Sequence, residues 1–218
     1  MVAYQTPDFA GFKVYAQYAM GTNDNENESR SDRYYALGAT YNNGPFAGYF
    51  AVDSINYQTA NATGALENAS DIDDSLTVTL GGSYDFEAVK VYLGAQYFDE
   101  VKLSNFKGVI KAAGVGQSNK VKGYGISLTG DAPVLGGKAM FGIGYTDAES
   151  ADSEDKSADV ELQRYVVSVG YDYPFSKRTD VYAVASYMQD SWEDKSTANK
   201  VEGDPSAYTL YVGLRHRF

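Results

Sequence analysis

The chain has 218 residues, 20 of them Tyr, and carries 29 acidic against 18 basic side chains, for a formal net charge of −11. It has no Cys and a single His, His216, which excludes disulfides, thiolate metal sites and multi-histidine metal centres among these residues. A chain this acidic is a poor match for phosphate backbones, so no nucleic-acid partner is expected. No stretch of 18 apolar residues occurs, so neither a transmembrane helix nor the apolar part of an export signal is predicted.

The charges are gathered in separate stretches. Four Asn- and Ser-rich segments each carry a net charge between −3 and −5: residues 22–32, 66–74, 147–159 and 190–204. Residues 101–122 do the opposite, with five Lys and no acid. Because the remaining segments are nearly neutral, apolar and aromatic, the charged stretches are predicted to be connections.

The intervening segments alternate between apolar and polar residues with a period of two, which is typical of β-strands with two different faces. Residues 12–18 place Phe, Val, Ala and Tyr on one side and Lys, Tyr and Gln on the other. The same alternation runs through residues 89–97, 138–146 and 208–218. No comparable run places apolar residues three and four apart, so helices are not expected.

Taken in chain order, the pattern predicts eleven strands. They cover residues 1–6, 11–20, 33–42, 46–58, 74–85, 88–99, 120–130, 137–148, 160–172, 179–191 and 205–218. Tight turns rich in Gly, Asn and Pro (7–11, 42–45, 85–88, 131–137 and 173–179) alternate with the long charged stretches. Antiparallel strands joined in this way have all tight turns on one rim and all long connections on the other.

Strand length and aromatic residues favour a sheet that crosses a membrane. Strands of about ten residues span a hydrocarbon layer at a tilt. Aromatic residues lie near the strand ends, as in the interfacial girdles of outer-membrane barrels: Tyr18, Tyr34, Tyr35, Tyr97, Tyr145, Tyr171, Tyr173, Tyr187 and Trp192. A β-sandwich would also alternate, but its loop lengths would not divide between two rims. The predicted fold class is therefore all-β, a transmembrane antiparallel β-barrel in which residues 1–218 form one domain.

Three segments carry a resemblance to a known family. Val2–Phe12 (VAYQTPDFAGF), Tyr173–Tyr182 (YPFSKRTDVY) and Tyr211–Phe218 (YVGLRHRF) resemble the Gram-negative general porins of the trimeric kind found in Neisseria and Burkholderia. The resemblance implies a sixteen-stranded barrel in the bacterial outer membrane, with short periplasmic turns, long external loops and a third loop folded inward. It also implies a homotrimer in contact with membrane lipid and lipopolysaccharide, and a C-terminal Phe218 that signals to the outer-membrane assembly machinery.

The strand count differs from that of the family. The first and the last predicted strand both end at the rim of tight turns, so they cannot pair with each other in an all-antiparallel barrel. We therefore expect that this chain is the C-terminal portion of a sixteen-stranded barrel, with about five strands and the constriction loop upstream. In the alternative, residues 1–8 are not a barrel strand and residues 11–218 close as a smaller barrel.

The predicted function is passive diffusion of ions and small hydrophilic solutes through a water-filled channel. Residues that alternate with the apolar set would line the water, and their charges would set selectivity. These candidate pore-lining residues are Lys13, Lys90, Lys138, Arg164, Arg215, Arg217, Asp53, Asp85 and Asp172. Six bases against three acids predict a weak anion preference, with all the bases except Arg164 in an arc at the mouth beside the tight turns. The alternative function is a small closed barrel that acts as an adhesin or receptor through acidic external loops.

No catalytic, cofactor or metal site is predicted. His216 is two residues from the C-terminus, on the apolar side of its strand, which is a poor position for a general base. The acidic runs at residues 71–74 and 152–155 lack the Gly and Glu of an EF-hand loop, which leaves at most weak divalent-cation binding.

Overall fold

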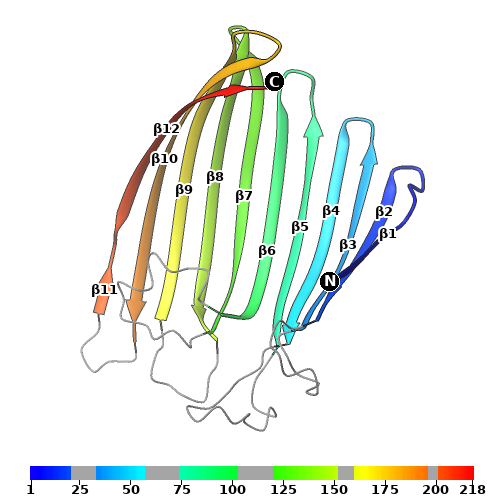
Figure 1. Cartoon of the computed structure of the whole chain (residues 1–218). Coiled ribbons are helices and arrows are strands. Elements are labelled where there is room, and N and C mark those ends of the chain that lie inside the picture. Colours follow the sequence, from blue (N-terminus) through cyan, green and yellow to red (C-terminus); the bar gives the residue numbers. More distant parts are fainter. Residues whose placement is uncertain (21–32, 57–73, 103–119, 152–159, 196–200) are drawn as a thin grey trace.

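The computed structural model describes residues 1–20, 33–56, 74–102, 120–151, 160–195 and 201–218, and these residues form a single antiparallel sheet (Figure 1). Its strands are β1 (Val2–Gln5), β2 (Phe12–Ala19), β3 (Arg33–Asn43), β4 (Phe46–Asn56), β5 (Ser75–Asp85), β6 (Lys90–Lys102), β7 (Lys120–Val134), β8 (Gly137–Ser150), β9 (Val160–Pro174), β10 (Thr179–Asp194), β11 (Val201–Gly203) and β12 (Ser206–His216). From β1 to β10, each strand pairs with its neighbours in the sequence.

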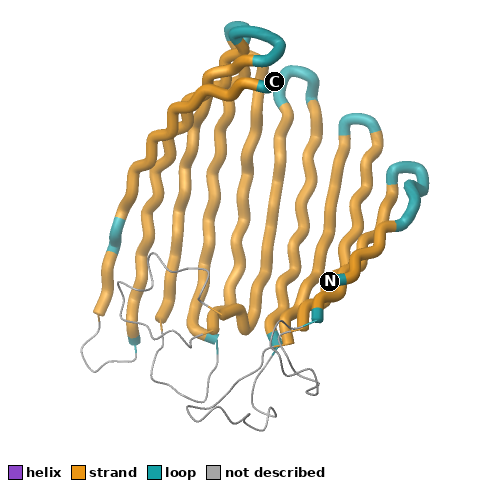
Figure 2. The backbone as a smooth tube through the Cα atoms, viewed as in Figure 1, coloured by secondary structure: helices purple, strands orange, loops and turns teal. Residues whose placement is uncertain are grey.

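The tight turns all lie on one rim of the sheet, and the strand ends that flank the charged stretches lie on the other (Figure 2). We call these the short-turn rim and the long-loop rim. At the hairpin between β7 and β8, only Leu135 and Gly136 separate the paired residues Val134 and Gly137, and both have positive φ. Two such residues match the right-handed twist of the flanking strands, so this hairpin is tight.

The two edge strands run in the same direction. Gln5 of β1 pairs with Tyr15 near the short-turn rim, and His216 of β12 pairs with Thr179 at the same rim. The predicted end points of the first and last strands are therefore confirmed. Because β1 is part of the sheet, and the described part of β12 pairs with β10 alone, the alternative of a smaller barrel closed by residues 11–218 is wrong.

A short additional strand, β11, lies in the stretch 190–204 that was predicted to be a connection, which gives twelve strands where eleven were predicted. Both β11 and β12 pair with β10, and residues 204–205 separate them. Pro205 has no N–H with which to continue the ladder, but its carbonyl accepts a bond of 2.9 Å from the amide of Asp190. In effect, β11 and β12 are one wall strand with a break.

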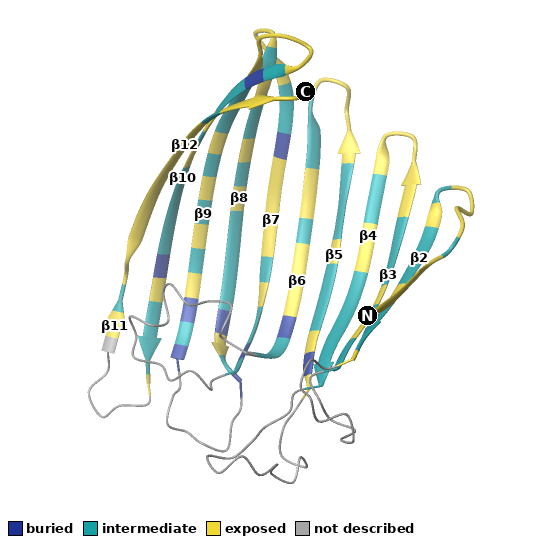
Figure 3. Ribbon diagram, in the orientation of Figure 1, coloured by how far each residue is buried: buried dark blue, intermediate teal, exposed yellow. Residues whose placement is uncertain are grey.

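A packed interior contributes little to this sheet. Phe98, Val121 and Ala148 form a small buried cluster near the strand ends at the long-loop rim, but most strand residues are intermediate or exposed (Figure 3). No helix in the described ranges is both long and apolar enough to cross a membrane. What organises the sheet is the difference between its two faces.

Candidate functional site

One face of the sheet, the apolar face, presents large hydrophobic side chains to its surroundings. Cross-strand pairing places them in one continuous band: Val14, Leu37, Phe50, Leu80, Leu93, Ile126, Leu128, Phe141, Ile143, Val167, Val169, Leu210, Val212 and Leu214. Ile143 is 53% exposed, Leu93 62% and Leu210 71%. A contiguous exposed apolar surface of this extent is rare on soluble monomers and marks contact with lipid or protein.

Tyrosines border this band near the long-loop rim. Tyr145 packs between Tyr124 and Tyr165, with ring centroids 6.1 and 4.8 Å apart, and Tyr187 packs on Tyr208 at 4.9 Å. Near the short-turn rim, Tyr171, Tyr173 and Phe175 form a second row. On β9, Tyr171 follows Tyr165 by six positions, or about 20 Å at ~3.3 Å per residue. This spacing is comparable to the apolar band of about 25 Å between the girdles of outer-membrane barrels.

Two of the predicted girdle residues lie on the other face. Tyr34 pairs with Ala19, and Trp192 pairs with Gly203 and Leu162, so both are in register with the polar side of the sheet. Their prediction as interfacial residues was wrong, because nearness to a strand end does not fix the face.

The opposite face, the polar face, carries small and hydroxyl-bearing side chains. Its hydrogen bonds include Gln96 Nε2 to Thr79 Oγ1 at 3.2 Å and a hydroxyl pair between Ser168 and Ser186 at 2.8 Å. All the predicted pore-lining residues that belong to strands lie on this face, as their cross-strand pairing shows: Lys13, Asp53, Asp85, Lys90, Lys138, Arg164, Asp172 and Arg215. Asp53 pairs with Ala36 and Thr77 on this face.

Four further acids lie on the polar face. Asp131 pairs with Lys90, Asp180 with Arg215, Asp190 with Arg164, and Asp194 with Val160. Asp131 was missed because the predicted strand ended at residue 130, whereas β7 continues to Val134, and Asp194 was missed because β10 extends beyond the predicted end at residue 191. Asp180 and Asp190 lay inside the predicted strand 179–191 but were not counted among its charges. The predicted excess of bases on this face is therefore wrong, since seven acids face six bases.

Most of these charges form ion pairs near the short-turn rim. Lys13 lies 3.5 Å from Asp8 and Lys138 3.2 Å from Asp131. Arg215 lies 3.1 Å from Asp172 and 2.8 Å from Asp180, and Arg217 is 3.9 Å from Asp180. The predicted basic arc is thus an arc of alternating sign.

Lys90 differs from the other bases of this rim. In the part of the chain that the structure describes, its ammonium has no carboxylate within 4 Å, and it lies 5.4 Å from the centre of the Tyr92 ring. The Tyr92 hydroxyl donates to Asp131 at 2.9 Å, so the carboxylate of Asp131, which pairs with Lys90 across the strands, is already engaged by Tyr92 and Lys138. Lys90 is therefore a positive charge on the polar face without an ion pair among the described residues.

Arg164 and Asp190 form a separate pair toward the long-loop rim. The guanidinium donates two hydrogen bonds to the carboxylate, at 2.6 and 2.9 Å, and the Asp190 side chain is only 1% exposed. A bidentate pair of this kind fixes the relative position of the two strands as well as neutralising the buried charge. Its position on neighbouring strands makes it a structural connection between β9 and β10.

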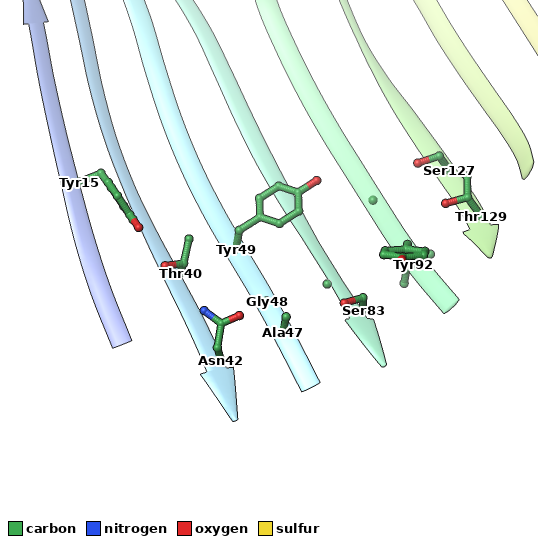
Figure 4. A pocket seen from close by; sticks show the side chains of 13 residues that line it. Tyr15, Thr40, Asn42, Ala47, Gly48, Tyr49, Ser83, Tyr92, Ser127 and Thr129 are labelled. Carbon is green, nitrogen blue, oxygen red and sulfur yellow. The ribbon is translucent and has the colours of Figure 1, made fainter. Parts of the chain in front are cut away.

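A groove lies on the polar face, across β2 to β7 (Figure 4). It has a volume of about 640 Å³, and no charged side chain lines it. Tyr15, Tyr49 and Tyr92 project into it from different strands, together with Thr40 and Thr129. We call it the tyrosine groove.

The remaining candidates have no catalytic geometry. His216 Nδ1 lies 2.9 Å from Thr179 Oγ1, and its ring packs on Phe218 at the short-turn rim. Among the described residues, no group of three or more His, Cys, Asp or Glu side chains is placed to hold a metal ion. Most of the acidic stretches considered for weak cation binding lie outside the described residues.

Comparison with known proteins identifies the family. Residues 1–192 match the family of Gram-negative porins. An outer membrane porin protein of Bordetella pertussis is 29% identical over all of this chain and 57% of its own length. The major outer membrane protein P.IB of Neisseria sicca is also 29% identical, over all of this chain and 58% of its own length. The chain thus spans somewhat more than half the length of these relatives.

Solved structures share the fold. An anion-selective porin from Comamonas acidovorans has a TM-score of 0.65 and 22% identity, covering 99% of this chain and 58% of that one. The outer-membrane protein OmpT of Vibrio cholerae has a TM-score of 0.60 and 16% identity, covering 98% and 63%. With its open two-faced sheet, the chain is part of an outer-membrane β-barrel, and it belongs to the Gram-negative porin family.

Proposed function

We propose that the chain forms part of the wall of an outer-membrane channel through which ions and small hydrophilic solutes diffuse passively. The observation that carries this proposal is the division between the two faces. The apolar face carries no charged residue between its aromatic rows, whereas the polar face has its hydroxyls and thirteen charged residues. Such a division suits lipid on one side and water on the other.

Closure of the channel requires further strands. The edge strands β1 and β12 run in the same direction, so an odd number of antiparallel strands has to lie between them. About five additional strands satisfy this condition and give the sixteen of the trimeric porins. We propose a homotrimer in contact with lipid and lipopolysaccharide, with Phe218 presented to the assembly machinery at the short-turn rim.

A channel is preferred to an enzyme or an adhesin. His216, the one histidine of the chain, contacts Thr179 and Phe218 and has the parity of the apolar face, so it does not face the polar side of the sheet. The adhesin hypothesis required a closed small barrel, which the open sheet does not support.

Conductance of the complete channel tests the proposal. The protein, reconstituted in planar lipid bilayers in KCl, is expected to produce stepwise, ohmic current increments as channels insert. A protein that folds in the bilayer, as judged by its β-sheet circular dichroism, but carries no current would contradict the channel function.

We further propose a weak anion preference, which Lys90 supports and the presence of seven acids beside six bases limits. A unit charge about 10 Å from an ion in water interacts by ~0.4 kcal/mol, or a factor of about two in local concentration. Lys90→Glu is therefore expected to shift the cation-to-anion permeability ratio at least about twofold toward cations at low salt. Reversal potentials across a KCl gradient measure this ratio.

The matched control is Lys122→Glu, which makes the same charge change on the opposite face at the long-loop rim, where Lys122 lies 3.5 Å from Glu149. Its reversal potential is expected to remain near that of the parent channel. If both variants shift the reversal potential equally, Lys90 does not set the field in the lumen.

A further inference from the structure

We propose that the tyrosine groove is a binding subsite for neutral, polyhydroxylated ring solutes of the size of a mono- or disaccharide. The inference rests on the proposed channel function, because it requires the polar face to be wet. The volume of about 640 Å³ lies within the range of small-molecule sites, about 300–1,000 Å³.

Unengaged hydroxyls supply the polar part of the site. Within the described residues, the hydroxyls of Tyr15, Tyr49 and Thr40 have no protein hydrogen-bond partner, and those of Ser127 and Thr129 have none either. Each hydroxyl can donate one hydrogen bond and accept others, as sugar hydroxyls do. A polyhydroxylated solute can therefore exchange its bonds to water for bonds to this wall.

Tyr49 supplies a fixed aromatic surface. It pairs with Gly81, and a Cβ atom built on Gly81 would lie 2.5 Å from the Tyr49 ring, so the ring rests on the glycine backbone. Figure 4 shows the side chain extending across β5 toward β6. The Tyr49 residue is 46% exposed, which leaves the side of the ring away from Gly81 available to the C–H face of a sugar ring.

Because glycines have no side chain, they leave the floor of the groove open. The register row that contains Tyr49 continues through Gly81 and Gly94 to Ser127, and a Cβ atom on Gly94 would lie 3.0 Å from Ser127 Oγ and 3.8 Å from the Tyr49 hydroxyl. A methyl group at Gly94 would thus occupy space beside the Tyr49 ring.

The charges around the groove favour a neutral solute. Lys13 lies one strand away from Thr40 and is paired with Asp8, while Asp131 is engaged by Tyr92 and Lys138. No charge lines the groove itself, and Lys90 lies 5.4 Å from the centre of the Tyr92 ring at the short-turn end, so over the rest of the groove an ionised solute would lose hydration without gaining an opposite charge.

Titration with maltose tests the inference in two independent readouts. Maltose is expected to reduce the KCl current of the bilayer-reconstituted channel with saturation, and to show saturation-transfer NMR signals on the detergent-folded protein. Tyr49→Ala is expected to raise the maltose half-saturation concentration about tenfold, because it removes the stacking surface. Gly94→Ala is expected to raise this concentration as well, without removing an aromatic ring.

Two matched variants separate binding from folding. Tyr182 covers Gly213 on the same face in the way that Tyr49 covers Gly81, with the Cβ position 2.4 Å from its ring, but lies outside the groove. Gly144 lies in the same register row as Gly94, but also outside the groove. Tyr182→Ala and Gly144→Ala are expected to leave the maltose titration unchanged.

Several outcomes would overturn the inference. A conducting channel without a saturable maltose effect removes the subsite and leaves the channel function intact. Equal weakening by Tyr49→Ala and Tyr182→Ala would assign the effect to sheet structure rather than to the groove. If the protein carries no current, the channel function fails, and the NMR titration still decides whether maltose binds at the groove.

Discussion

An arginine in place of Ile143 is expected to lower the free energy of unfolding by about 2–4 kcal/mol. Ile143 lies on the apolar face of β8, between Phe141 and Tyr145, and pairs with Leu128 and Val167. Its position near the middle of the apolar band would hold a guanidinium in hydrocarbon, far from water. Denaturant titration of the protein folded in lipid vesicles, followed by Trp192 fluorescence, measures the change.

The control for this prediction is Gln96→Arg, on the polar face of β6. Its side chain donates one hydrogen bond, of 3.2 Å, to Thr79 Oγ1 on the water-facing side, so we expect a cost below about 1 kcal/mol. Equal costs for the two arginines would mean that the faces are not divided between lipid and water.

Replacing Asp190 by Ala is expected to cost about 3 kcal/mol of folding free energy, because it leaves the charge of Arg164 without its partner in a mostly buried site. Asp190 is 1% exposed and Arg164 26% exposed, and two hydrogen bonds of 2.6 and 2.9 Å join them. The double replacement Arg164→Leu with Asp190→Leu is expected to cost less than the single one, since no unpaired charge remains. The same denaturant titration gives both values.

An exposed ion pair provides the comparison. Glu149 is 49% exposed and lies 3.5 Å from Lys122, so Glu149→Ala is expected to cost no more than about 1 kcal/mol. If the double replacement is as costly as Asp190→Ala alone, the pair matters for its packing rather than for its charge.

The two-faced sheet could be predicted because the face that a strand residue occupies depends only on the period-two alternation along its own strand. Once residues 12–18 and 138–146 alternate, each side chain in them is assigned to a face without knowledge of the partner strand. The strand ends could not be predicted in the same way. Pro133 within residues 131–137 indicated a turn, yet β7 passes through Pro133 and turns only at Leu135 and Gly136.

Misplaced strand ends explain part of the error in the candidate site. Asp131 was assigned to a turn, and the extension of β7 to Val134 moves it to the polar face. Asp180 and Asp190 lay within the predicted strand 179–191 but were not counted among the charges of this face. The tyrosine groove could not be predicted either, because it depends on which residues of different strands become neighbours. Only the register shows that Tyr49 meets Gly81 and that Gly94 meets Ser127.

The division of connections between the two rims means that the sequence is free to vary in length at one rim and not at the other. Closing a flexible connection twice as long costs only about 0.6 kcal/mol more entropy, so insertions between β4 and β5 or between β8 and β9 leave the sheet nearly as stable. A single residue added between Val134 and Gly137 can instead shift the pairing of β7 with β8 by one position. That shift would turn Phe141 and Ile143 toward water and their polar neighbours toward lipid. Surface diversity in a lineage of such chains can therefore accumulate at the long-loop rim, while the short-turn rim keeps its residue count.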